Sequence, residues 1–193
     1  MIAAAEDPIG DAAIRKLLIS ACKKEVTAVL QLRGNTYLRA RARELNRTAK
    51  SHPVIMLTDQ DRTEDCPPII RRAWFGTDRV DVCFNVAVME VEAWLLADQE
   101  AISKLLGVAS SRIPASIEDI QNPKLFIVNL ARGSRYSRIR QDLVPSPGST
   151  AAVGPLFNPT LVGFVGSNWS PTRAARSAPS LARAIQRIKS KFC

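Results

Sequence analysis

Short apolar runs alternate with segments of helical periodicity through the first 105 residues, and this alternation constrains the fold more than any other feature of the sequence. Four runs have the length and apolar content of buried strands: residues 2–5, 26–32, 53–59 and 80–88. The helical segments that follow them begin at Asp11, at residue 36, at Pro67 and at Glu90. Strands separated by helices predict an α/β domain with a mostly parallel sheet.

Local signals predict three helix boundaries. Asp11 is expected to cap the first helix, because apolar residues follow it at the spacing i, i+3, i+4, i+7. A break is expected near Asp98, within the segment 90–105. Ser180 is expected to cap a last helix that has one apolar face and carries its cations mostly elsewhere.

Composition predicts one domain with a small appendage. The 193 residues are 46% apolar, which is enough to bury a core of ordinary size. Six of the twelve prolines and four of the nine glycines follow Leu143. We therefore expect an α/β domain over residues 1–143 and a Pro/Gly-rich basic extension over 144–193, which ends in a helix and packs on the same domain.

Several classes of protein and site are excluded. No apolar run approaches about 18 residues, and the start of the chain lacks the basic flank of a signal peptide, so we expect no membrane contact and a cytoplasmic location. Cys22, Cys66, Cys83 and Cys193 are scattered, which argues against a zinc ribbon and a secreted disulfide framework. His52 is the single histidine, so no site can hold a metal with two histidines. No P-loop motif is present.

Positive charge is concentrated in the second half of the chain. The formal net charge is +9, and residues 1–111 carry equal numbers of basic and acidic residues. From Arg112 onward there are 12 basic residues and three acidic ones. Such asymmetry indicates a polyanionic partner, although a solvated basic surface without a ligand is the alternative.

Two carboxylates follow the buried run 53–59. Asp59 and Asp61 are two residues apart, so in extended chain they point to the same side, and the carboxyl edge of a parallel sheet is where ligands bind. A hard divalent cation relieves the repulsion between two such groups. Glu6 follows the first run and is expected at the same edge. A solvated turn for the aspartates, and a first-turn helix residue for Glu6, are the alternatives.

A glutamate after the first strand, followed by Asp-x-Asp after a later strand of a parallel sheet, resembles the Toprim superfamily of topoisomerases, bacterial primases and overcoming-lysogenization-type nucleases. In that superfamily the Asp-x-Asp pair holds Mg²⁺, and the glutamate acts as general acid/base or as a metal ligand. The resemblance thus implies Mg²⁺ (or Mn²⁺) at Asp59 and Asp61, with Glu6 beside it.

A closer resemblance extends over most of the chain. The chain is similar to a family of small stand-alone Toprim-like bacterial proteins, often encoded beside a large ATPase in defence-type loci. The segments that carry this resemblance are Val86–Asp98, Asn122–Lys124, Val153–Asn158, Trp169–Pro171 and Ser177–Leu181. The resemblance implies an ATPase partner and a role in antiviral defence.

Glu92 is a further candidate. Glu90 and Glu92 cannot face the same way on one helix, and Glu92 lies nearer the apolar face. It is expected to be a metal ligand or a supporting acid, or else a buried carboxylate paired with Arg71 or Arg72. Trp94 is expected in the core. Trp169 and Phe157 are expected to pack the C-terminal segment onto the sheet, with base stacking as the alternative.

A run of cations falls in and after a predicted helix that ends near Gly133. The residues expected to contact a nucleic-acid backbone are Lys124, Arg132, Arg135, Arg138 and Arg140. If the segment 135–140 is extended, it presents three cations on one face, and if it is irregular it is a solvated loop.

These observations predict a Toprim-like, Mg²⁺-dependent nuclease that cleaves DNA or RNA, with Glu6, Asp59, Asp61 and Glu92 as catalytic residues. The main rival is a non-catalytic nucleic-acid-binding or regulatory subunit that docks on an ATPase. A nucleotidyl transferase of primase type is weaker, because 193 residues leave no room for domains that handle a template.

Overall fold

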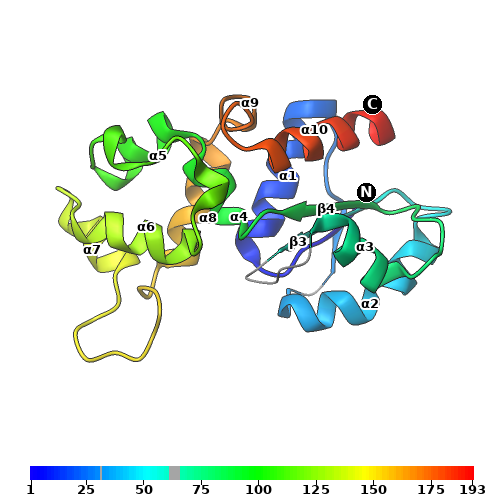
Figure 1. Cartoon of the computed structure of the whole chain (residues 1–193), viewed down its shortest axis with the longest axis horizontal. Helices are drawn as coiled ribbons and strands as arrows, with labels where there is room; N and C mark the ends of the chain where they lie inside the picture. Colours follow the sequence, from blue (N-terminus) through cyan, green and yellow to red (C-terminus); the bar gives the residue numbers. More distant parts are fainter. Residues whose placement is uncertain (31, 61–65) are drawn as a thin grey trace.

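The computed structural model describes residues 1–30, 32–60 and 66–193. Its centre is a four-stranded, all-parallel sheet with the order β2-β1-β3-β4 (Figure 1). The strands are β1 (Ile2–Ala4), β2 (Ala28–Val29), β3 (Val54–Asp59) and β4 (Cys83–Ala87). The predicted α/β class, with a parallel sheet flanked by helices, is confirmed. The edge strand β2 is much shorter than the predicted run 26–32, and both of its residues are exposed.

The helices follow the strands as the periodicity predicts. In the first half they are α1 (Pro8–Cys22), α2 (Gly34–Thr48), α3 (Pro67–Phe75), α4 (Val91–Leu96) and α5 (Gln99–Leu106). In the second half they are α6 (Pro123–Arg132), α7 (Ser137–Leu143), α8 (Phe157–Ser167), α9 (Pro171–Ala174) and α10 (Pro179–Phe192). Short 3-10 turns at Ser110–Arg112 and Ile117–Asp119 join α5 to α6.

Strands β3 and β4 are buried on both faces of the sheet. Alternate residues of β3 point to opposite sides, so Ile55 and Leu57 join the core formed with α1 and α10, whereas Val54 and Met56 pack with α2 and α3. This two-sided burial explains why β3 is a continuous apolar run in the sequence, as is typical of parallel sheets. Truncation of Met56 to alanine in such a core costs about 2–5 kcal/mol.

The second half of the chain leaves the sheet and then returns to it. Helices α5, α6 and α7 lie to one side of the sheet (Figure 1). Helix α8 then packs on α1, and α10 packs on both α1 and β4. Trp94, on α4, and Trp169, between α8 and α9, are both buried. The indole N–H of Trp169 donates to the carbonyl of Trp94 over 3.0 Å. Both tryptophans are therefore core residues, as expected, and so is Phe157.

Two of the three predicted helix boundaries, the caps at Asp11 and Ser180, are wrong, and the third, the break near Asp98, is confirmed. Asp7, not Asp11, caps α1, because its Oδ1 accepts from the backbone N–H of Gly10 over 2.8 Å. The predicted break near Asp98 is present, and it is fixed by two hydrogen bonds from the Arg173 guanidinium to the buried Asp98 carboxylate. Ser180 lies in the first turn of α10 rather than at its cap, because the helix begins at Pro179 and its cap residue is Ala178.

No helix among the described residues combines the length and the apolar content needed to cross a membrane.

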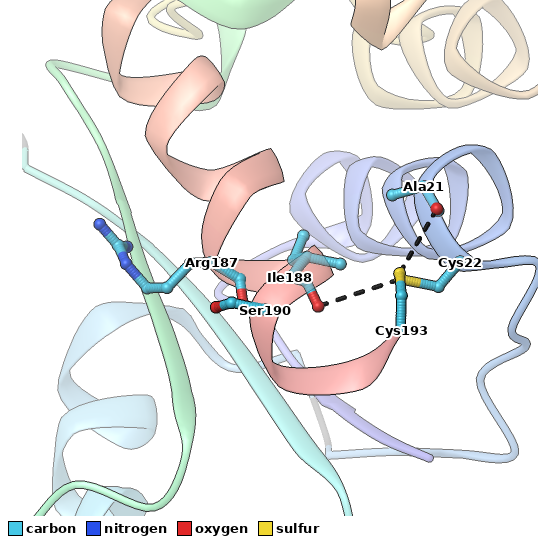
Figure 2. Close-up of a disulfide and its surroundings, with 6 residues drawn as sticks. All are labelled: Ala21, Cys22, Arg187, Ile188, Ser190 and Cys193. Atoms are coloured by element: carbon cyan, nitrogen blue, oxygen red, sulfur yellow. Dashed lines mark hydrogen bonds between the residues drawn. A yellow bond between two sulfur atoms is a disulfide. The ribbon is translucent and has the colours of Figure 1, made fainter.

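A disulfide joins two distant parts of the chain. Cys22 ends α1 and bonds to Cys193, 171 positions later, which the scattered cysteine spacing did not indicate (Figure 2). The sulfur of Cys193 lies 3.4 Å from the carbonyl oxygen of Ala21, and that of Cys22 lies 3.9 Å from the carbonyl oxygen of Ile188. The bond thus fastens the end of α10 to the end of α1.

We predict that Cys22→Ser destabilises the protein by about 2–4 kcal/mol, because the disulfide restricts the unfolded chain over a long loop. The measurement is urea unfolding with and without a reductant. The reductant should lower the stability of the wild type to that of the variant. The matched control is Cys66→Ser, at an exposed free thiol, which should unfold like the wild type. Equal stability of the wild type in both conditions would contradict a structural role for the bond.

Candidate functional site

Acidic side chains gather at the carboxyl edge of the sheet. Glu6 follows β1, Asp59 ends β3, and Glu90 follows β4. Because β1, β3 and β4 are neighbours and parallel, their carboxyl ends meet at one edge. The structure therefore brings Glu6 and Asp59 together, as the sequence predicts. Asp61, the second residue of the predicted pair, lies outside the described residues.

Glu6 is held by three donors on one oxygen. Its Oε1 accepts from Asn35 Nδ2 over 2.9 Å, from the Thr58 hydroxyl, and from the backbone N–H of Asp59 over 3.0 Å. Its backbone carbonyl accepts from the N–H of Gly34, where a φ of 80° favours glycine. The start of α2 and the end of β3 thus fix the direction of this carboxylate. Sequence analysis did not single out Asn35 or Thr58, because neither side chain belongs to a recognisable motif.

Asp59 connects β3 to α4, the helix that follows β4. Its Oδ1 accepts from the backbone N–H of Val91, the first residue of α4, over 2.8 Å. Its own N–H bonds to Glu6, so a single residue links the ends of β1, β3 and α4. Asp59 is therefore positioned by the backbone of its neighbours rather than by a flexible surface loop.

The turn after β4 has an unusual backbone. Met89 has a φ of 61°, a region that non-glycine residues rarely adopt. The turn places Glu90 so that its Oε2 accepts from the backbone N–H of Lys124 over 2.7 Å. Lys124 lies in the first turn of α6, so Glu90 fastens that helix to the edge of the sheet.

Glu92 is completely buried on α4. Its side chain is 0% exposed, and neither carboxylate oxygen accepts a hydrogen bond within the described residues. Lys124 Nζ lies 3.4 Å from Glu92 Oε1, so the partner of this buried carboxylate is a lysine from α6 and not Arg71 or Arg72. Burial raises the pKa of Glu92 to about 7, against the attraction of Lys124, while Asp7 and Glu90 raise it further.

Lys124 lies among acids. Burial lowers the pKa of its ammonium, but the attraction of Glu92, followed by that of Asp7, Glu90 and Asp59, outweighs burial and leaves the pKa raised. The side chain is 34% exposed, so the ammonium reaches both the buried Glu92 and the solvent. Lys124 was predicted to contact a nucleic-acid backbone, and the structure places it beside Glu92, Glu90 and Asp59.

The other predicted nucleic-acid contacts are separate from the acidic edge. Arg132 is at the opposite end of α6, about 12 Å along the helix from Lys124. The segment 135–140 is partly helical, because α7 begins at Ser137. Neither of the two predicted forms, an extended segment or a loop, is therefore correct. Arg140 donates to the carbonyl of Ser134, and Arg138 lies 3.4 Å from Asp142. The three cations therefore do not form the flat face expected of a strand.

The acidic edge suits a divalent cation that keeps most of its water. In the described ranges, no three His, Cys, Asp or Glu residues form a ready metal cage. Glu6 and Asp59 nevertheless supply carboxylate oxygens at the ends of adjacent strands, and the backbone N–H of Asp59 donates to Glu6 Oε1. Mg²⁺ is usually bound through one or two carboxylates, with water and substrate phosphate completing its octahedron. Glu6 and Asp59 fit that kind of site.

No family model, curated protein or solved structure matches this chain. The Toprim resemblance therefore remains a prediction from the motifs.

We predict that Glu92→Gln changes how stability depends on pH. The native pKa of Glu92, about 7, is above the ordinary value of 4.5, so the native state holds this proton more tightly than the unfolded state. The resulting stabilisation is complete below about pH 4.5 and is lost as the pH rises through 7, by about 3 kcal/mol. Glu92→Gln should remove this fall.

The measurement is urea unfolding between pH 4.5 and 8 in EDTA. The matched control is Glu25→Gln, at an exposed carboxylate near the other end of the sheet, which should keep the wild-type profile. Parallel profiles for Glu92→Gln and the wild type would show that Glu92 does not titrate in this range.

Proposed function

We propose that this protein is a phosphodiesterase that cleaves nucleic acid with the help of a divalent cation. The observation that carries the proposal is the hydrogen bond from the Asp59 N–H to the Glu6 carboxylate. It joins two acids from adjacent strands at the edge of a parallel sheet where ligands bind. The partly exposed Lys124 pairs with the buried Glu92, and its charge also interacts with Asp59.

Glu6 and Asp59 would hold Mg²⁺ (or Mn²⁺), with Asp61 as the third predicted ligand. The cation supplies Lewis-acid polarisation of a phosphate and lowers the pKa of a bound water. Asn35 and Thr58 keep Glu6 Oε1 directed at the edge, which leaves its other oxygen to face the ion or to accept a proton.

Lys124 would bind a phosphate oxygen of the substrate. Its ammonium is charged at neutral pH and partly exposed, and it lies at the same edge as Glu6 and Asp59. Glu92 has no contact with solvent, so within this proposal it acts through Lys124 by holding the ammonium in place.

The charge distribution favours nucleic acid as the substrate. Twelve basic residues against three acidic ones follow Ser111, and most phosphate contacts in nucleic-acid complexes come from such cations. The sequence contains no P-loop, so an ATPase partner in the cytoplasm, as the resemblance implies, would supply any ATP-driven control.

We predict that Asp59→Asn and Glu6→Gln each lower Mg²⁺-dependent cleavage at least about a hundredfold. Asparagine keeps the acceptor for the Val91 N–H and removes only the charge, so folding should be retained. The measurement is cleavage of plasmid DNA and of single-stranded RNA, with melting temperature as the check on folding. Asp78→Asn, at an exposed aspartate before β4, is the matched control and should cleave like the wild type.

Full cleavage in EDTA, or by the Glu6→Gln/Asp59→Asn double variant, would contradict the proposal. If the protein binds DNA or RNA tightly but cleaves neither in the presence of Mg²⁺ and Mn²⁺, the result would favour the alternative of a non-catalytic nucleic-acid-binding subunit.

We predict that the arginines beyond Lys124 contribute to binding without selecting a sequence. Changing Arg132, Arg135 and Arg138 together to alanine should reduce the slope of log affinity against log salt by about 2–3, because each phosphate contact contributes about 0.7–0.9. The measurement is fluorescence anisotropy with an oligonucleotide. The control is the triple alanine variant of Arg39, Arg41 and Arg43 on α2, and equal slopes for both variants would rule out this surface.

A further inference from the structure

A groove runs along the open edge of the sheet at β4, and none of its described lining residues is one of the acids of the candidate site. It has a volume of about 670 Å³ and lies between α3 and α10, which flank β4 on opposite faces of the sheet (Figure 1). Its lining consists of Pro67, Pro68, Arg71, Val80, Val82, Cys83, Phe84, Val86, Arg183, Arg187, Ser190 and Lys191. An open strand edge is a template for pairing with another chain unless something covers it.

The backbone N–H and C=O groups of Val86 face this groove. The Gln60 N–H donates to the Ala87 carbonyl, so Ala87 faces β3, and Phe84, Val86 and Val88 face the open edge by alternation. At the two ends of the edge, the Phe84 carbonyl accepts from Arg187 over 2.9 Å and the Val88 N–H donates to the Ser180 hydroxyl over 3.4 Å. The N–H and C=O of Val86 lie between these two anchors.

The cations of α10 form a regular row beside the groove. Arg183, Arg187 and Lys191 are four residues apart, so they share a face of the helix and repeat about every 6 Å. Helix α10 runs antiparallel to β4, because Ser180 contacts Val88 and Arg187 contacts Phe84. Figure 2 shows the Arg187 side chain extending from α10 toward the sheet. Side chains on one face of a strand repeat every 6.6–6.8 Å or so, which nearly matches the row of cations.

The other wall of the groove is apolar. Phe84 and Val86 alternate along β4, so they share the face of the sheet that α3 covers. Val80 and Val82, just before β4, pack in the same apolar cluster, and Pro67 and Pro68 also line the groove. Arg71 adds a fourth cation, and no acidic residue lines the groove within the described residues. Burial lowers the pKa of the Arg187 guanidinium, opposed by Cys83 and reinforced by Arg183. Among the residues that the structure describes, the row of cations therefore has no acidic counter-charge in the groove lining.

We propose that this groove binds an extended acidic segment of a partner protein, which pairs with β4 as an added strand. The acidic side chains of that segment alternate with apolar ones. The acids face Arg183, Arg187 and Lys191, the apolar side chains contact Pro67, Pro68 and the valine row, and Val86 supplies the central backbone hydrogen bonds. A short segment is expected, because Arg187 and Ser180 already occupy the flanking backbone groups. The inference stands independently of the proposed nuclease activity.

A protein segment fits this groove better than a nucleic acid does. A strand edge offers backbone hydrogen bonds that a peptide can complete, and alternating walls of opposite polarity match the two faces of a strand. Base stacking needs exposed aromatic rings, and the one aromatic residue of the lining, Phe84, is 6% exposed.

The test uses a synthetic peptide of about eight residues in which aspartate alternates with valine, capped at both ends. We expect the full-length protein to bind this peptide, measured by calorimetry, and to ignore the version with lysine in place of aspartate. Arg183→Ser/Lys191→Ser should weaken binding about three- to tenfold, which corresponds to the loss of two exposed ion pairs. The matched control is Lys189→Ser, on the same helix but outside the groove lining, which should bind normally.

A second measurement separates strand addition from charge attraction. Bound peptide should slow hydrogen exchange at the Val86 amide, and a peptide with N-methylated valines should bind at least about tenfold more weakly, because it cannot pair with β4. Equal binding of the methylated peptide, or unchanged exchange at Val86, would overturn strand addition. If an oligonucleotide binds and loses affinity in Arg183→Ser/Lys191→Ser while the peptide fails to bind, the groove belongs to nucleic acid and the proposal is wrong.

Discussion

Parallel pairing of β3 with both β1 and β4 is the constraint on which the rest of the structure depends. It brings the carboxyl ends of three strands to one edge, and it leaves β4 with an unpaired side. The first consequence places Glu6 beside Asp59, and the second creates the groove beside α10. Helices on both faces bury the sheet, so neither feature can shift without loss of core packing.

Burial of the ion pair between Glu92 and Lys124 costs desolvation energy, and the pair positions helix α6. A fully buried carboxylate that accepts no hydrogen bond within the described residues has a raised pKa, and one ammonium at 3.4 Å compensates only part of the desolvation. Such pairs add little stability over an apolar pair of the same shape. In this protein the pair fixes the start of α6 against the edge of the sheet, together with the hydrogen bond from the Lys124 N–H to Glu90. Helix α6 is therefore coupled to the site although it lies in the part of the chain away from the sheet.

The two candidate surfaces carry opposite charges. Acidic groups surround the carboxyl edge of the sheet, whereas α10 and α3 line the β4 groove with cations. In our proposals, a divalent cation and a substrate phosphate bind at the first surface, and an acidic peptide binds at the second. The disulfide between Cys22 and Cys193 fastens the end of α10, so it holds the cationic row in register with β4.

The sequence by itself determined the parallel α/β class, the meeting of Glu6 and Asp59, and the break at Asp98, because periodicity and strand direction are local properties. Tertiary structure decided what distant segments supply: Lys124 as the partner of Glu92, Asn35 as a donor to Glu6, and the Cys22–Cys193 bond. These contacts join residues far apart in the chain. The residue pattern of a helix or strand predicts which of its faces is apolar, but it does not predict which other segment packs against that face. That choice follows from how the whole core packs.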